Sequence, residues 1–475
     1  MNDLDLCYLS AHEAIGLFKS GKLSPVELME ATIRRAEALK GSVNALTYTH
    51  FDEAMDRARK AEAKYAKGAR IGVLEGLPVG IKDESDIAGK PTSIGSLIQK
   101  DYIADRTSTM NARIMAAGGI AHARTATPEF CCAGTTWSRL WGVTRNPWNP
   151  DFTCGGSSGG AGASLASGTS TLATGSDIGG SIRIPASACG VVGYKPPYGR
   201  NPDDTPFNLD FFCHTGPMAR TVKDAILLQN VMCGPDPQDI ASLRPKLRLP
   251  LEYKPIKGWK IAFSMNLGVF EVDPDVQKNT LAALDVFRSL GATVEEVDLG
   301  WPPHILEAGM GYLEHLFGGY LSTLLEEHGD KMTTYARDFA EKGRVSKSTD
   351  FVGSLEVIGE MYRTLGPILD RYDVLVCPTN ALPAVPADFD HTTGTVEING
   401  KLVNPSLGWV MTTPFNMMSR CPVLSVPSGR AGTGVPTGLQ IVGRTYRDAD
   451  VFRAGLAFEE AAGPWYGDAA HRPSL

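Results

Sequence analysis

The chain is organised around Thr153-Cys-Gly-Gly-Ser-Ser-Gly-Gly160 and, a little further on, Gly175-Ser-Asp-Ile-Gly-Gly-Ser-Ile-Arg183. Each segment is a glycine-rich turn that carries a serine, Ser157 in the first and Ser181 in the second. Glycines at this density remove side-chain bulk and let several backbone N–H groups point into one space. Such a space suits a developing negative charge, and a serine beside it can supply a nucleophile.

A third element is the segment Leu77-Pro-Val-Gly-Ile-Lys-Asp83. Leu77, Val79 and Ile81 alternate as in a β-strand, which leaves Lys82 at its carboxyl end. A lysine in that place usually extends its amine to solvent. The functional alternative is a desolvated amine whose pKa falls until it can act as a base. Together with the two serine turns, Lys82 favours the functional interpretation.

Short apolar runs and helical patterns interleave from Leu77 onward, which favours one large α/β sheet over separate folds. The expected strands are 77–82, 120–123, 169–174, 191–194, 260–263, 293–297, 373–376, 423–426 and 439–442. The expected helices are 111–117, 221–232, 275–290 and 447–462, with a mixed stretch over 304–369.

The first residues read as a helical layer. Ser10-Ala-His-Glu13 and Ser24-Pro-Val-Glu27 both match the capping box, and a more charged helix is expected over 52–67. We expect a single domain that comprises 1–65 as an N-terminal helical layer, 66–235 with the catalytic motifs, and 236–475 with the remaining sheet and covering helices.

Composition narrows the class of protein. The chain has 475 residues, 43% of them hydrophobic, and a net charge of −7, which argues against a nucleic-acid or anionic-membrane surface. Nine cysteines without a C-x-x-C pair suggest neither a disulfide framework nor a zinc site. The acidic N-terminus lacks the order of a signal peptide, and no apolar run reaches the roughly 18 residues that span a bilayer. We expect a cytoplasmic protein without metal or cofactor.

Two other uses of the glycine-serine turns have less support. Gly155-Gly-Ser-Ser-Gly159 matches the G-x-S-x-G nucleophile elbow, but Asn146-Pro-Trp-Asn-Pro150 before it is not the strand that an elbow needs. The histidines show no recognisable partner pattern. Neither a P-loop motif nor a strand-led G-x-G-x-x-G occurs, so nucleotide binding is not indicated.

Several separated blocks resemble the amidase signature family. The blocks are Val79-Gly-Ile-Lys-Asp83, Gly155-Gly-Ser-Ser-Gly-Gly160, Gly175-Ser-Asp-Ile-Gly-Gly-Ser-Ile-Arg-Ile-Pro-Ala186, Cys189-Gly-Val-Val-Gly-Tyr-Lys-Pro196 and Gly216-Pro-Met-Ala-Arg-Thr-Val222. The match is densest over 77–224, and weaker agreement extends over nearly the whole chain. The resemblance implies a single large mixed, twisted β-sheet covered on both faces by helices.

The resemblance also implies a Ser-cisSer-Lys triad. Ser181 would be the nucleophile that forms an acyl-enzyme, and Ser157, after a cis Gly156–Ser157 peptide, would relay the proton. Lys82 would be the neutral general base. The oxyanion hole would consist of the backbone N–H groups of Ile178, Gly179, Gly180 and Ser181.

Further residues receive supporting roles. We interpret Asp177 and Arg183 as charges that hold the second turn, and Ser158 as a brace within the loop. Substrate-binding candidates precede the first turn, in the region that often borders the acyl pocket of this family, and hint at an apolar or aromatic acyl group. These candidates are Cys131, Cys132 and Trp137.

The function that the resemblance implies is a stand-alone amidase for a small-molecule substrate. The bond would be a carboxylic amide or a related acyl–nitrogen bond, in a hydrazide, anilide or carbamate, or an ester. One alternative is the A subunit of a glutamyl-tRNA amidotransferase, and another is a non-catalytic binding protein on the same fold. Homodimers are frequent in such families, so the resemblance also allows a homodimer.

Overall fold

The computed structural model, which describes residues 1–467 and 471–475, is built on one eleven-stranded sheet. Its strand order is β1-β3-β2-β6-β8-β7-β14-β15-β11-β9-β10. The strands are β1 (Leu46–Thr49), β2 (Pro78–Lys82), β3 (Ile120–Thr125), β6 (Leu172–Asp177), β7 (Val192–Lys195), β8 (His214–Ala219), β9 (Lys260–Phe263), β10 (Thr293–Glu296), β11 (Val374–Pro378), β14 (Val423–Arg430) and β15 (Pro436–Val442). Two small hairpins stand apart from it, β4 (Trp137–Ser138) with β5 (Gly142–Val143) and β12 (Val396–Ile398) with β13 (Lys401–Val403).

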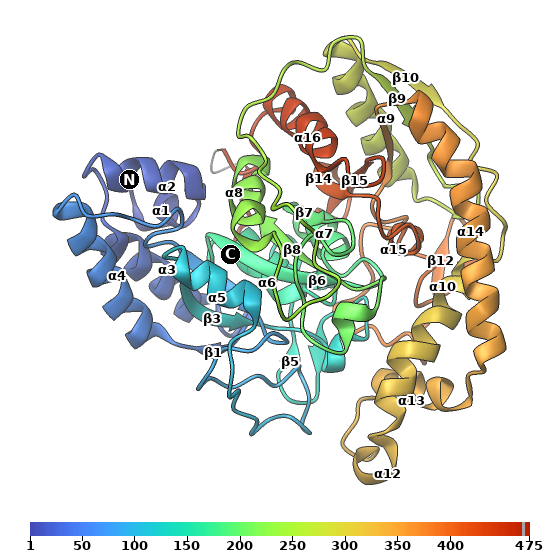
Figure 1. The fold of residues 1–475 in the computed structure, drawn as a ribbon, viewed down its shortest axis with the longest axis horizontal. Helices are drawn as coiled ribbons and strands as arrows, with labels where there is room; N and C mark the ends of the chain where they lie inside the picture. The colour runs from blue at the N-terminus through green and yellow to red at the C-terminus, as the bar shows by residue number, and fades with distance from the viewer. Residues whose placement is uncertain (468–470) are drawn as a thin grey trace.

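The sheet is mixed, as expected. Strands β3, β2 and β6 run parallel, as do β11, β9 and β10, whereas the strands between these two groups pair antiparallel. Helices cover both faces, and Figure 1 shows the N-terminal helices at one end of the molecule and α10 to α14 at the other. The helices are α1 (Asp3–Cys7), α2 (Ala11–Lys19), α3 (Pro25–Leu39), α4 (Phe51–Ala66), α5 (Thr109–Ala116), α6 (Gly159–Ala166), α7 (Arg183–Cys189), α8 (Val222–Met232), α9 (Pro274–Ser289), α10 (Ile305–Leu313), α11 (Gly319–Ser322), α12 (Leu325–His328), α13 (Thr334–Val345), α14 (Ser348–Arg371), α15 (Pro414–Met417) and α16 (Asp448–Ala462), with short 3₁₀ turns at Glu129–Cys131 and Phe207–Leu209 and a π-helical turn, η3, at Glu314–Gly318.

The local signals for helix ends are confirmed, whereas two strands of the large sheet were not predicted. Both capping boxes form, at Ser10 and at Ser24. Strand β1 is a short edge strand with no fully buried side chain, so its sequence carries little apolar alternation. Strand β8 contains a glycine and a proline, residue types that are depleted from strands, so its sequence does not indicate a strand.

The strand order places the functional motifs beside one another. Strand β2 pairs in parallel with β6, with Val79 opposite Leu172 and Gly80 opposite Ala173. The carboxyl ends of parallel neighbours lie at the same edge of a sheet. Lys82 at the end of β2 therefore lies next to the turn that follows β6, and α6 brings the first serine turn to the same place.

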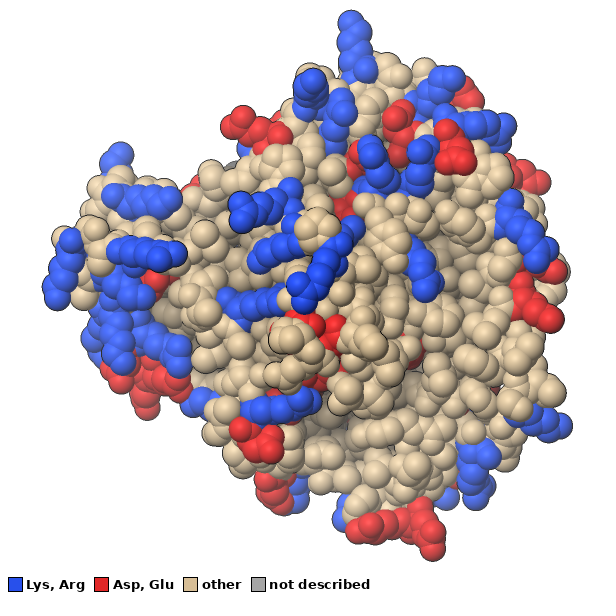
Figure 2. Space-filling model, viewed as in Figure 1, with Lys and Arg blue, Asp and Glu red and all other residues tan. Residues whose placement is uncertain are grey.

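Charged side chains are unevenly distributed on the surface. Figure 2 shows Lys and Arg side chains gathered near the middle of one face and a largely uncharged region below and to the right of them, with Asp and Glu side chains at the lower edge. Within the described residues, no helix is both long enough and apolar enough to pass through a bilayer.

Candidate active site

Lys82 is completely buried and lies against the first serine turn. Its Nζ donates hydrogen bonds to Ser157 Oγ at 2.8 Å and to Ser176 Oγ at 2.7 Å. Its backbone N–H donates to Thr174 Oγ1 at 3.0 Å, which ties the end of β2 to β6. The structure thus brings together Lys82 and Ser157, two residues that the sequence placed in one site.

Ser157 and Ser181 belong to turns that are joined through Ser158. The Gly156–Ser157 peptide is cis, as the resemblance implied. Ser158 N–H donates to the Ser181 carbonyl at 3.1 Å, and the Ser158 hydroxyl contacts backbone atoms of Ser176 at 3.3 Å, which is the bracing role expected of it. Within the described residues the Ser181 hydroxyl has no hydrogen-bond partner, so it is free to meet a substrate.

Two threonine hydroxyls hold the turn over residues 178–181 in place. The Gly179 carbonyl accepts hydrogen bonds from the hydroxyls of Thr412, at 2.7 Å, and Thr413, at 3.0 Å. Gly180 has φ of 124°, in a region that side chains other than glycine rarely adopt. In the part of the chain that the structure describes, the four backbone N–H groups of this turn donate to no other group. They can accordingly receive an oxyanion.

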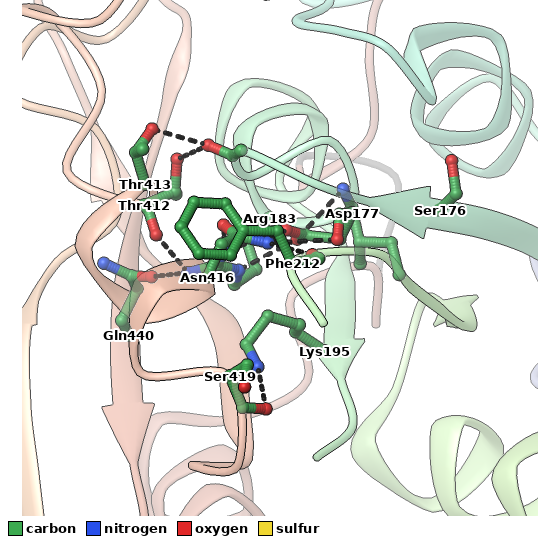
Figure 3. A network of polar contacts seen from close by, with 12 residues as sticks. Ser176, Asp177, Arg183, Lys195, Phe212, Thr412, Thr413, Asn416, Ser419 and Gln440 are labelled. Atoms are coloured by element: carbon green, nitrogen blue, oxygen red, sulfur yellow. Dashed lines mark hydrogen bonds and ion pairs between the residues drawn. The ribbon is translucent and has the colours of Figure 1, made fainter. Parts of the chain in front are cut away.

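Asp177 and Arg183 flank this turn and form a buried ion pair (Figure 3). Two parallel hydrogen bonds of 2.9 Å join the carboxylate to the guanidinium, and both side chains are inaccessible to solvent. Arg183 also donates to Gln440 Oε1 at 2.6 Å and to Asn416 Oδ1 at 2.7 Å. Burial would raise the pKa of Asp177, but the charge and hydrogen bonds of Arg183 outweigh it and lower the pKa, so the carboxyl stays ionised.

The Ser181 side chain opens into an apolar pocket. The pocket is lined by Cys131, Cys132, Ala133, Gly134, Ile178, Gly179, Ser181, Ile184, Met310, Leu313, Phe317, Phe339, His391, Ser406, Leu407 and Val410. Trp137 lies outside this lining. Its ring packs edge-on against Tyr335, and its indole N–H donates a hydrogen bond to the Phe389 carbonyl. Burial lowers the pKa of His391, so that this side chain is neutral at pH 7. Among the described residues, no group of three His, Cys, Asp or Glu side chains is placed to hold a metal ion.

The protonation of Lys82 differs from the expectation. Burial disfavours the charge of Lys82, as the sequence suggested, but the negative charge of Glu84 and a hydrogen bond to Glu84 oppose burial, and the pKa is raised. Glu84 Oε2 lies 3.2 Å from Lys82 Nζ. The expectation of a lowered pKa was therefore wrong, because it considered burial and not this carboxylate.

Glu84 and Ser176 are residues of the site that the sequence did not single out. Ser176 Oγ donates to Glu84 Oε2 at 2.8 Å, so the two side chains and Lys82 form one cluster. The strand pattern could not predict Glu84, because the chain turns after Lys82, and the Glu84 N–H donates to the Lys82 carbonyl at 2.8 Å. Ser176 lies within the quoted glycine-rich segment and at the end of β6, next to β2.

A second buried lysine, Lys195, lies under the same network (Figure 3). Its Nζ donates to the backbone carbonyls of Cys421 at 3.0 Å and of Ser419 and Pro196 at 3.4 Å. Burial, with a contribution from the nearby charge of Arg183, lowers the pKa of Lys195 to about 7.

Comparison with known proteins gives the same architecture. The Amidase family model matches residues 27–452. An acylamidase of Rhodococcus erythropolis is 35% identical over 471 residues, covering 98% of each chain. The A subunit of a glutamyl-tRNA(Gln) amidotransferase from Cyanothece sp. is 31% identical, and the match covers 94% of this chain and 96% of that one. The solved structure of a bacterial aryl acylamidase of the amidase signature enzymes matches with a TM-score of 0.88 at 33% identity, covering 96% of this chain and 97% of that one. The chain belongs to the amidase signature family.

Proposed function

We propose that the protein is a stand-alone amidase that hydrolyses amides of apolar or aromatic carboxylic acids through an acyl-enzyme on Ser181. The observation that carries this proposal is the 2.8 Å contact between Lys82 Nζ and Ser157 Oγ, together with an apolar pocket whose lining includes Ser181. The proposal includes a cytoplasmic location and no nucleic-acid, membrane or cofactor partner, and it is compatible with a homodimer.

Acylation requires a base, because a serine alkoxide does not form unassisted at neutral pH. Ser181 Oγ attacks the substrate carbonyl carbon and passes its proton to Ser157, while Ser157 passes its own proton to neutral Lys82. The carbonyl oxygen becomes an oxyanion among the backbone N–H groups of residues 178–181. The C–N bond then breaks as the proton returns through Ser157 to the leaving nitrogen. Water repeats the sequence and releases the acid.

The character of the pocket supports an apolar acyl group. Its walls consist mainly of Leu313, Phe317, Phe339, Leu407 and Val410, and neutral His391 is the one imidazole among the described residues that line it. The ammonium and carboxylate of a glutamine would lie there without ionic partners, and an unpaired buried charge is costly. The names of the acylamidase and aryl acylamidase relatives support this choice over an amidotransferase component.

A substrate panel tests the proposal. We expect the purified chain alone to release nitroaniline from 4-nitroanilides of benzoic and hexanoic acid, and to release little ammonia from glutamine. The Ser181→Ala variant serves as the inactive control. Glutaminase activity that requires an added partner would favour the amidotransferase component instead. A wild-type chain that no fluorophosphonate labels at Ser181 would favour a non-catalytic binding protein.

A further inference from the structure

Glu84 is the centre of a cluster of donors. Its Oε2 atom accepts a hydrogen bond from Ser176 Oγ at 2.8 Å and one from Cys131 Sγ at 3.0 Å, and it lies 3.2 Å from Lys82 Nζ. The Glu84 side chain is 20% exposed, whereas that of Lys82 is 1% exposed. One carboxylate oxygen thus joins the buried amine to a strand residue and to a residue of the pocket wall.

Other ionisable groups near Lys82 do not replace this charge. Cys131 and Cys213 face Lys82, but burial raises the pKa of both thiols, so both are uncharged at neutral pH. Glu84 is the carboxylate in direct contact with the amine.

Two further groups act on Glu84 from neighbouring elements. Arg124 on β3 lies near Glu84, but its guanidinium is 3.8 Å from Asp83, which balances its charge. Asp203 also faces Glu84, and burial, with a contribution from the Glu84 charge, raises the pKa of Asp203 to about 7. Neither group contacts Lys82 directly, so the balance at the amine depends on Glu84.

The proposed proton transfer to Lys82 explains what the Glu84 carboxylate can do. When Ser181 is acylated, a proton arrives at Lys82 and turns a buried neutral amine into an ammonium. Hydroxyls alone compensate a buried ammonium poorly, whereas a carboxylate in contact does so well. The same contact also favours the ammonium before reaction, so it must move the onset of activity to higher pH.

We propose that Glu84 is a positioning residue of the proton relay, whose carboxylate stabilises the Lys82 ammonium that forms while Ser181 is acylated. The inference rests on the proposed function. One proton moves from Ser181 to Ser157 and one from Ser157 to Lys82, and none moves to Glu84. It acts through Lys82 and touches neither the substrate nor the nucleophile.

The test measures the rate at which a fluorophosphonate labels Ser181 as a function of pH. In this reaction Ser181 Oγ bonds to phosphorus, fluoride leaves, and the proton remains on Lys82, so no leaving nitrogen needs a proton. The acid limb of this profile is the range in which the labelling rate rises with pH. For Glu84→Gln we expect this limb to shift to lower pH by one unit or more. We also expect the rate on the alkaline plateau to fall at least tenfold, because the less basic amine accepts the proton less well.

Matched variants separate this role from a general effect of charge. Glu84→Asp keeps the carboxylate and should retain a limb close to that of the wild type. Asp86→Asn removes the same charge two residues further along, where its carboxylate meets Tyr102 rather than Lys82, and should leave the profile unchanged. Glu84→Ala removes the charge with a smaller side chain and serves if the glutamine variant does not fold.

The outcomes separate this inference from the function on which it rests. A folded Glu84→Gln or Glu84→Ala protein with the limb and plateau of the wild type overturns the role of Glu84 and leaves the proposed function standing. A limb that moves equally in Asp86→Asn overturns it as well. A wild-type chain that is not labelled at Ser181 overturns the proposed function, and this inference with it.

Discussion

Arg183 forms two parallel hydrogen bonds with Asp177 across the turn at residues 178–181, and neither side chain is accessible to solvent. The pair closes the loop that presents Ser181. The salt bridge therefore maintains the shape of the turn at residues 178–181, which is the proposed oxyanion hole.

The first prediction concerns this pair. Removing one member of a buried ion pair leaves an uncompensated charge and typically costs about 3–5 kcal/mol. We expect Arg183→Met to lower the free energy of unfolding by about that amount, measured by denaturant titration. The double variant with Asp177→Asn should recover part of the loss, and an equal or greater loss in the double variant would contradict this account.

The second prediction compares two adjacent glycines. A Cβ at Gly180 would overlap the Thr412 side chain, and the φ of 124° disfavours alanine there whatever the space. A Cβ at Gly179 would meet its nearest neighbour, Thr413 Oγ1, at an ordinary 3.7 Å. We expect Gly180→Ala to reduce the labelling rate of Ser181 at least a hundredfold, and Gly179→Ala to reduce it less than tenfold. Equal effects would show that the turn tolerates displacement.

The third prediction concerns the proposed roles of Ser181 and Lys82. Ser181→Ala should abolish labelling and reduce amide turnover at least a thousandfold in a protein with the circular dichroism spectrum of the wild type. Lys82→Ala should slow amide cleavage more than cleavage of the matching ester, because the amine leaving group needs a proton. Steady-state rates on a paired anilide and ester measure this, and equal losses would argue against the base.

The fourth prediction follows from the pKa of Lys195, which burial lowers from 10.5 to about 7. Between these values the unfolded chain holds one proton more than the folded chain, so stability must rise with pH. This group should add about 1.4 kcal/mol to the free energy of unfolding per pH unit over that range. Lys195→Met should lack this rise in denaturant titrations from pH 7 to 10, and parallel slopes for both proteins would refute it.

Local sequence predicted the elements of this site better than their contacts. The alternation at Leu77, Val79 and Ile81 located β2, and the glycine-rich turns located the two serines. Thr412, Thr413 and Asn416 form a clamp on the turn at residues 178–181. This clamp could not be predicted, because its residues lie more than 200 residues from the turn and only the sheet topology brings them near.

The electrostatics of the site were the harder part. The sequence shows that Lys82 follows a buried strand, which predicts desolvation, but the sign of its pKa shift depends on where the Glu84 carboxylate points. That orientation is set by Ser176 on the neighbouring strand, a contact between β6 and the chain just after β2. Patterns within one segment do not determine contacts between segments.

The clamp at residues 412–416 also has a consequence for biosynthesis. The ribosome completes Lys82, Ser157 and Ser181 long before it reaches Thr412 and Asn416. A nascent polypeptide therefore carries all three proposed catalytic side chains before the residues that hold the turn at 178–181 have been synthesised. If the proposed mechanism holds, we expect acyl transfer to begin only after translation nears its end, and a chain that stops before Thr412 to be inactive.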